Sequence, residues 1–380
     1  MCRSGMDLRH LYLHVPFCLR RCSYCDFAVH PTRRPPIGDW LSAIATELRL
    51  SREVEGWPAR LRLSSIYIGG GTPSLLGIGA MQALRETLEQ HGSIDADVEW
   101  TAEANPESFT AELGADWRYA GVNRISLGVQ SFHAPALRWM GRLHGADGAR
   151  AAMDSARAAG FDNVSIDLIF GLPQKLERNW PEDLDLALAL APDHISLYGL
   201  TAESGAALGR WVIEGRAAMP SEENYSDEYL TAARVLPAAG FVHYEVSNFG
   251  KPGRESRHNR AYWNFSPYLG LGPGAHSYHP PRRFWNVRDW GLYQRRLAGN
   301  ALPREDSEVV DRDSLERIWL GLRTREGAYL PDRTEIVQRH LKQWQGAGWA
   351  EVDAERVRLT PAGWLLLDRL AVELEGMIAA

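Results

Sequence analysis

The chain has 380 residues, of which 45% are hydrophobic and 24% charged, as is ordinary for a globular protein of about two domains. Its net charge of −6 argues against a dedicated nucleic-acid binder, so no nucleic acid is expected as a partner. Neither a long apolar run nor a signal-peptide core appears, so a cytoplasmic protein is expected, with transient membrane association left open.

Short apolar runs alternate with amphipathic helical patterns through the first half of the chain. Several runs are continuous rather than alternating, which is typical of parallel strands covered on both faces. The predicted strands are Leu11–Val15, Ser65–Ile68, Val98–Ala102, Arg124–Leu127, Asn163–Ile169 and Ile195–Tyr198. Repeated strand–helix units indicate an α/β fold with right-handed crossovers. Since six units are too few for an eight-stranded barrel, we expect a partial, open (β/α)6 barrel with its site at the carboxyl ends of the strands.

The pattern changes after the sixth unit and divides the chain into three predicted regions. Residues 1–240 form the barrel, and residues 241–306 form an irregular linker region rich in Gly, Pro, His, Asn and aromatic residues. Residues 307–380 form a smaller α+β domain whose order of elements resembles a winged helix. Its predicted elements are helices Leu315–Leu322 and Arg333–Gln345, strands Ala350–Val352 and Val357–Leu359, and a helix from Pro361.

Three of the four cysteines form a C-x3-C-x2-C motif after the first predicted strand, at Cys18, Cys22 and Cys25. Three thiolates can bind three irons of a [4Fe–4S] cluster. The fourth iron can then bind the amino and carboxylate groups of S-adenosylmethionine (SAM). Cys2 is expected to be a free thiol. The alternative is a zinc site completed by His14 or Asp26, although zinc sites more often contain two C-x2-C pairs or distant histidines.

Glycine-rich or polar sequences follow the next predicted strands. Gly69–Pro73 follows the second strand, and its glycines allow the backbone to approach a ligand closely. Glu103 and Gln130 lie at the ends of the third and fourth strands, and Asp167 lies within the apolar fifth strand. Arg142, in the sequence Gly-Arg-Leu-His, can pair with the SAM carboxylate. Each residue alone fits an ordinary polar role, but together they predict a site at one edge of the sheet.

The cysteine motif resembles that of the radical-SAM superfamily. Nearly the whole chain is similar to the oxygen-independent coproporphyrinogen III oxidase-like family, which contains the oxidase HemN and the haem chaperone HemW. The resemblance implies a [4Fe–4S] cluster and SAM as cofactors. The positions that match the family's SAM contacts are Tyr12, Tyr24, Gly70, Gly71, Thr72, Glu103, Gln130, Arg142, Asp167 and, less closely, His276.

Within this family the sequence is more similar to the haem chaperone branch. The oxidase motif continues to a further cysteine where this chain has Phe27, and a long arm precedes the oxidase cluster where here seventeen residues precede Cys18. His258 begins an H-N-x-x-Y-W motif that is similar to the chaperone signature. Its imidazole can ligate haem iron, and Tyr262 and Trp263 can pack on a porphyrin.

The resemblance therefore implies a protein that binds haem and passes it to acceptor proteins, expected in the respiratory chain, with a flavodoxin or ferredoxin as electron donor. Two alternatives stay open. One is a radical enzyme that decarboxylates coproporphyrinogen III to protoporphyrinogen IX. The other is a non-enzymatic iron–sulfur regulator that uses the winged-helix-like tail, which the acidic net charge disfavours.

Overall fold

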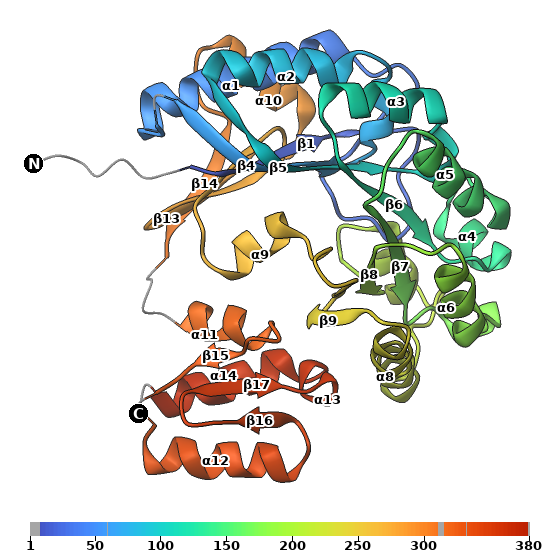
Figure 1. Ribbon diagram of the computed structural model, residues 1–380, viewed down its shortest axis with the longest axis vertical. Helices are drawn as coiled ribbons and strands as arrows, with labels where there is room; N and C mark the ends of the chain where they lie inside the picture. Colours follow the sequence, from blue (N-terminus) through green and yellow to red (C-terminus); the bar gives the residue numbers. More distant parts are fainter. Residues whose placement is uncertain (1–7, 59, 311–314, 332, 379–380) are drawn as a thin grey trace, which may run out of the picture.

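The computed structural model describes residues 8–58, 60–310, 315–331 and 333–378, and its largest feature is a curved sheet (Figure 1). Neighbouring strands at the centre of this sheet run parallel, in their order along the chain. They are β1 (His10–Val15), β4 (Leu61–Gly70), β5 (Gly92–Ala104), β6 (Arg124–Gln130), β7 (Val164–Phe170) and β8 (His194–Gly199). Each coincides with or overlaps a predicted strand, so the partial, open (β/α)6 barrel is confirmed.

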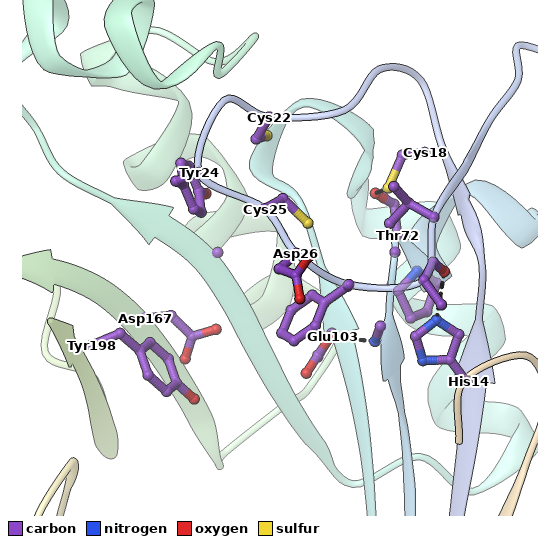
Figure 2. Close-up of a pocket in the computed structure, with 18 of the residues that line it drawn as sticks. His14, Cys18, Cys22, Tyr24, Cys25, Asp26, Thr72, Glu103, Asp167 and Tyr198 are labelled. Carbon is purple, nitrogen blue, oxygen red and sulfur yellow. Dashed lines mark hydrogen bonds between the residues drawn. The ribbon is translucent and has the colours of Figure 1, made fainter. Parts of the chain in front are cut away.

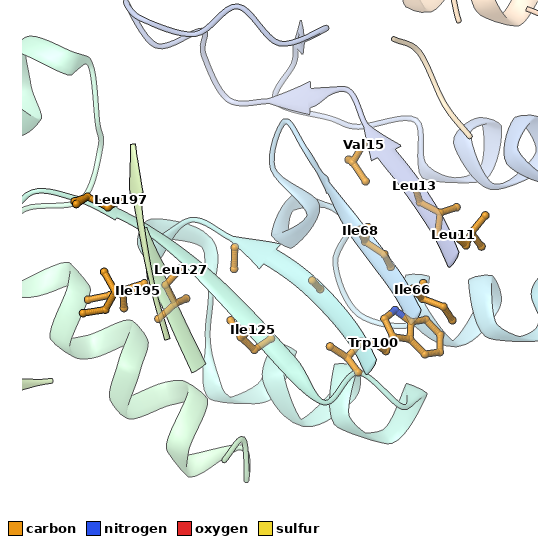
Figure 3. Packing of buried hydrophobic residues seen from close by; sticks show 14 of the residues in the cluster. Leu11, Leu13, Val15, Ile66, Ile68, Trp100, Ile125, Leu127, Ile195 and Leu197 are labelled. Atoms are coloured by element: carbon orange, nitrogen blue, oxygen red, sulfur yellow. The ribbon is translucent and has the colours of Figure 1, made fainter. Parts of the chain in front are cut away.

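Helices connect the parallel strands and cover the outer side of the curved sheet (Figure 1). They are α1 (Ile37–Glu55), α2 (Ala80–His91), α3 (Ala111–Ala120), α4 (Ala134–Met140), α5 (Ala146–Ala158), α6 (Trp180–Ala189) and α8 (Glu222–Ala238). The strand side chains that belong to the main hydrophobic core include Leu11, Ile66, Trp100, Ile125 and Ile195 (Figure 3). Removal of this apolar face from water is the main favourable contribution to folding of the barrel.

The inner face of the sheet is polar and lines a cavity, whereas the sequence predicted strands covered on both faces. On β1, Tyr12 and His14 line an internal cavity, whereas Leu11 and Leu13 belong to the core. The same period of two recurs on β7, where Asp167 lines the cavity between core residues. The apolar runs therefore describe the outer face alone, and the inner face carries groups suited to a polar ligand.

Residues 241–306 extend the sheet at both ends instead of forming the predicted irregular linker region. Their strands are β9 (Val242–Glu245), β10 (Asn248–Gly250), β11 (Tyr268–Leu271), β12 (His276–His279) and β13 (Arg282–Asn286), followed by α10 (Trp290–Ala298) and β14 (Arg304–Val309). Within the described residues the sheet has 12 strands, in the order β14-β13-β12-β11-β1-β4-β5-β6-β7-β8-β10-β9. Periodicity could not reveal these short strands because pairing with distant strands sets their register. The domain limits at 240 and 306 stay a prediction.

The short helix α9 (Arg257–Trp263) lies inside the arc of the sheet (Figure 1). The Ser256 side chain caps its N-terminus by accepting a hydrogen bond from the backbone N–H of Asn259. The Glu99 carboxylate on β5 accepts from the backbone N–H groups of Arg257 and His258, at 2.9 Å each. These bonds hold the predicted H-N-x-x-Y-W motif against the inner face of the barrel.

The described residues from 315 onward form a C-terminal unit beside the open side of the barrel (Figure 1). Its elements are α11 (Leu315–Leu322), β15 (Ala328–Tyr329), α12 (Glu335–Gly346), β16 (Ala350–Val352), β17 (Arg356–Leu359), α13 (Pro361–Trp364) and α14 (Leu367–Ile378). The predicted helices and strands are present, and the unpredicted β15 completes a sheet in the order β15-β17-β16. None of the helices in the described part of the chain combines the length and apolarity needed to cross a membrane.

Candidate functional site

A cavity of about 1370 Å³ opens where the parallel strands end, and Figure 2 shows part of its wall. Its lining includes residues from successive strand ends and from the loop that carries the cysteines. All residues predicted for the cluster and for SAM line this one cavity, namely Tyr12, Cys18, Cys22, Tyr24, Cys25, Gly70, Gly71, Thr72, Glu103, Gln130, Arg142, Asp167 and His276. His258, the predicted haem ligand, does not line it.

The cysteine loop is tied to the barrel at both its ends and its middle. The two-residue strands β2 (Phe17–Cys18) and β3 (His30–Pro31) pair in parallel and fix the ends. The backbone N–H of Ser23 donates to the carbonyl of Met140 at 3.2 Å, which ties the middle of the loop to α4. The three thiols are half-buried and lie along this loop above the strand ends (Figure 2).

Two polar side chains contact the cysteine sulfurs. The Thr72 hydroxyl donates to Cys18 Sγ at 3.5 Å, and Arg142 Nη1 donates to Cys22 Sγ at 3.9 Å. Burial nevertheless raises the pKa of the Cys18 thiol to about 11, and burial also raises the pKa of the Cys25 thiol. Without a bound metal these two thiols are protonated at neutral pH. Metal binding displaces these protons, and the hydrogen-bond donors Thr72 and Arg142 already lie beside the sulfurs.

The glycine turn after β4 packs directly beneath the cysteine loop. A Cβ atom on Gly71 would lie 2.6 Å from the Phe17 carbonyl oxygen and 3.0 Å from Cys18 Sγ. Gly70 has a φ of 107°, in the left-handed region, and a Cβ there would overlap the His14 ring. Only residues without side chains allow the backbone to approach the loop so closely.

Two carboxyl groups lie on the polar inner face near the strand ends (Figure 2). Glu103 accepts hydrogen bonds from the Tyr67 hydroxyl at 2.8 Å and from the Gly70 backbone N–H at 2.9 Å. Asp167 accepts from the Ser126 hydroxyl at 3.0 Å. Burial raises the pKa of Glu103 to about 7 and that of Asp167 to about 6, so both carboxyls titrate near neutral pH.

Arg142 is the buried cation of the site. Its Nη2 donates to Asn105 Oδ1 and to the Gly128 carbonyl oxygen, at 2.7 Å each, while its Nε has no hydrogen-bond partner. Gln130 ends β6 with a φ of 67°, next to a register shift between Leu127 and Gln130. Such an irregularity changes the direction in which a strand side chain points, and here Gln130 lines the cavity.

Tyr12, His14 and Tyr24 complete the wall near the loop. The His14 Nε2–H donates to the Ala28 carbonyl oxygen at 2.9 Å, because that oxygen can only accept, so Nδ1 accepts from the Tyr12 hydroxyl at 3.0 Å. Burial raises the pKa of the Tyr12 and Tyr24 hydroxyls, which therefore stay protonated and act as hydrogen-bond donors.

His258 lies away from the cavity, in the packed interior beneath it. Only 1% of its surface is exposed. A hydrogen bond of 2.8 Å joins its Nδ1 to the Ser65 hydroxyl, and another of 2.8 Å joins its Nε2 to the Tyr262 hydroxyl. Both ring nitrogens are thus already used, so iron ligation by His258 requires the loss of one of these bonds.

Sequence reasoning missed three further polar residues of the site. Asn105 accepts from Arg142 and donates to the Thr72 hydroxyl at 3.1 Å, and it lines the cavity together with Tyr198. Tyr67 hydrogen-bonds Glu103. The alternation of polar and apolar residues along the strands was the available signal, since Tyr67 and Tyr198 share the inward period of their strands.

Comparisons with known proteins agree with this architecture. Residues 12–187 match the model of the Radical SAM superfamily. The "Heme chaperone HemW" of Mycobacterium tuberculosis strain H37Rv is 38% identical over 371 residues, which are 96% of this chain and 94% of that protein. The Bacillus subtilis protein of the same name is 34% identical over 323 residues, 84% of each chain.

A solved structure is similar over almost the full length. Coproporphyrinogen III oxidase (HemN) from Escherichia coli, a radical SAM enzyme, has a TM-score of 0.79 and covers 98% of this chain and 91% of its own. Its sequence identity is 22%, so this likeness shows a shared fold.

Proposed function

Because the chain belongs to the haem chaperone HemW family of the radical SAM superfamily, we propose that it binds haem and delivers it to acceptor proteins. The observation that carries the proposal is the 38% identity to a curated relative named as a haem chaperone, over 96% of this chain. The proposed acceptors are proteins of the respiratory chain, and the proposed electron donor is a flavodoxin or ferredoxin.

Cys18, Cys22 and Cys25 are assigned as ligands of a [4Fe–4S] cluster. Each cysteine of such a cluster binds a different iron, so the thiolates must surround the cluster rather than meet at one ion. The described residues contain no group of three His, Cys, Asp or Glu side chains placed to hold a single metal ion. The Gly71 backbone packs tightly against the loop, and a Cβ there would press on the Phe17 carbonyl oxygen and on Cys18 Sγ.

The cavity residues that match the SAM contacts of the family are assigned to SAM. When bound together, the cluster and SAM supply one-electron reductive cleavage of SAM. Glu103 and Asp167 offer carboxylates to its amino group or ribose hydroxyls, and the unpartnered Arg142 Nε is available to its carboxylate. The Gly70–Gly71 backbone allows close approach, and the remaining SAM contacts expected from the family resemblance are Tyr12, Tyr24, Thr72, Gln130 and His276, all of which line the cavity.

Anaerobic reconstitution of the full chain tests these assignments together. We expect about four irons and four sulfides per chain, and saturation at about one haem per chain. Cys22→Ser should lower the iron content strongly, whereas the control Cys2→Ser should retain it. Bound zinc in place of iron, or no saturable haem uptake, would contradict the proposal. A parallel assay for 5′-deoxyadenosine shows whether SAM is cleaved.

The oxidase alternative predicts turnover of coproporphyrinogen III. Phe27, which is 63% exposed at the cavity, takes the place of the oxidase's further cysteine. Its ring supplies neither a thiolate nor a proton-transfer group. We expect the reconstituted protein to form no protoporphyrinogen IX in an anaerobic assay with an electron donor. Sustained turnover would favour the oxidase over the haem chaperone.

A further inference from the structure

A histidine can ligate haem iron only through a ring nitrogen that no other group occupies. Among the described residues, the histidines that line the cavity are His14 and His276. His14 already uses both nitrogens, one toward the Ala28 carbonyl and one toward Tyr12. His258 also uses both and lies outside the cavity.

His276 is the exception. It lies at the first position of β12 on the cavity wall, and no hydrogen bond of the described chain holds its ring. The ring instead stacks on the indole of Trp285, with centroids 5.6 Å apart and planes 21° apart. The stacking partner orients the imidazole without occupying either nitrogen. Burial and the nearby Arg283 lower the pKa of His276, which keeps the ring neutral and able to ligate a metal.

The cavity wall around His276 is aromatic. Phe265, Tyr268, Tyr278 and Trp285 line it together with Trp263 from the end of α9. Tyr268 and Tyr278 are paired across β11 and β12, and the Phe265 and Tyr278 rings meet edge to face at 5.7 Å. Such rings provide the flat apolar contact area that a porphyrin buries.

Two polar groups in this aromatic wall lack partners. The Tyr278 hydroxyl and the Trp263 Nε1 are both buried without a hydrogen bond. Tyr278 is only 1% exposed, and it projects from the same face of β12 as His276, roughly 7 Å along the strand. A buried donor without a partner is costly, so each indicates a ligand acceptor such as a propionate oxygen. Arg283 is excluded as a propionate partner because Glu308 and Glu316 already pair with it.

From these contacts we propose that His276 is the axial ligand of the bound haem, with the porphyrin packed against Trp285 and Tyr278 and a propionate hydrogen-bonded to the Tyr278 hydroxyl. The assignment rests on the proposed haem-binding function and replaces two roles expected from the sequence, His258 as haem ligand and His276 as a SAM contact. The same cavity holds the cysteine loop, and its volume of about 1370 Å³ exceeds the roughly 300–1,000 Å³ of a usual single-ligand pocket. The cavity is therefore large enough to hold haem beside SAM.

The test is a titration of the full chain with ferric haem, followed by Soret absorbance. We expect His276→Ala to weaken haem binding at least tenfold and to shift the Soret maximum, and we expect added imidazole to restore the wild-type spectrum. Rescue by imidazole reports iron ligation, because lost packing alone would not respond to it. His279→Ala is the matched control, since His279 lies on the same strand, against Trp57, and does not line the cavity.

His258→Ala separates the two candidate ligands. We expect it to lower the melting temperature, because two buried hydrogen bonds are lost, and to leave the Soret maximum of the haem complex unchanged. Wild-type affinity and spectrum in His276→Ala would overturn the assignment, and so would loss of the wild-type Soret spectrum in His258→Ala alone. If the unmodified chain takes up no haem at all, the proposed function itself fails, which this series distinguishes from a wrong ligand.

Discussion

Glu103 and Asp167 show how burial sets the chemistry of single residues in the cavity. Both carboxyl groups keep hydrogen bonds to their ionised oxygens, yet burial raises the pKa of Glu103 to about 7 and of Asp167 to about 6. Because these pKa values exceed those of unfolded chains, the protonated carboxyls stabilise the fold below about pH 4. That contribution is lost as the pH rises through about 6 to 7. The cost of ionisation decreases when a cation binds beside them.

At the residue scale, we predict that SAM binds more tightly as the pH rises from about 6 to 8. SAM carries a positive sulfonium group, and deprotonation of Glu103 and Asp167 supplies the opposite charge. Glu103→Gln should weaken binding about tenfold at pH 8 and flatten the pH dependence. Calorimetric titration of the reconstituted protein measures both effects. Glu86→Gln, on the exposed surface of α2, is the control, and an affinity of the wild type that does not vary with pH would contradict the prediction.

At the scale of the element, α9 depends on the barrel for its position. A helix of seven residues is too short to be stable alone. Glu99 compensates by accepting from the backbone N–H groups of Arg257 and His258 and from the Ser256 hydroxyl, and it is itself buried. The negative carboxylate at the helix N-terminus also interacts favourably with the positive end of the helix dipole. Glu99 thus positions Tyr262 and Trp263, which line the cavity.

We therefore predict that Glu99→Ala lowers the free energy of unfolding by about 2–4 kcal/mol, because buried N–H groups lose their acceptor. Urea denaturation of the metal-free chain measures this loss. The more conservative Glu99→Gln should lower the free energy of unfolding by less, since an amide oxygen still accepts one of these hydrogen bonds. Glu86→Ala, an exposed change, should alter stability by less than about 0.5 kcal/mol. Equal stability of Glu99→Ala and wild type would refute this role.

On the scale of the whole molecule, the C-terminal unit and the barrel share the cavity wall. Glu316 and Leu320 on α11 line the cavity opposite the barrel residues. Arg323, just after α11, pairs with the fully buried Glu245 of β9 at 3.3 Å and lies 4.5 Å above the Trp263 ring. The contact thus connects the C-terminal unit to α9 and to the proposed haem site.

We predict that Arg323→Ala destabilises the protein by about 3 kcal/mol, because it leaves the Glu245 carboxylate buried without its cation. Hydrogen exchange should increase in α11 and α13, and haem affinity should fall several-fold as α11 separates from the cavity. Mass spectrometry of deuterium uptake and a Soret titration measure these changes. Arg325→Ala is the control, since this neighbouring side chain is exposed and makes no ion pair in the described chain. Unchanged exchange in α11 would contradict the prediction.

The sequence by itself determined the parallel strands and placed the cysteine motif and two carboxyl residues at one edge of the sheet. Strand periodicity and thiolate spacing are local properties, and parallel strands must bring their carboxyl ends to one edge, so local patterns alone suffice to group Cys18, Glu103 and Asp167. Residues 241–306 could not be predicted in this way, because β11 and β12 exist only by pairing with the rest of the sheet.

Only the tertiary structure decided which histidine is free to bind iron. His258 and His276 both stand in aromatic-rich segments and are equivalent by composition. Ser65, 193 residues away in the sequence, occupies one nitrogen of His258, whereas Trp285 supports His276 without occupying either nitrogen. Burial and hydrogen-bond availability depend on packing between distant segments, which local sequence patterns do not record.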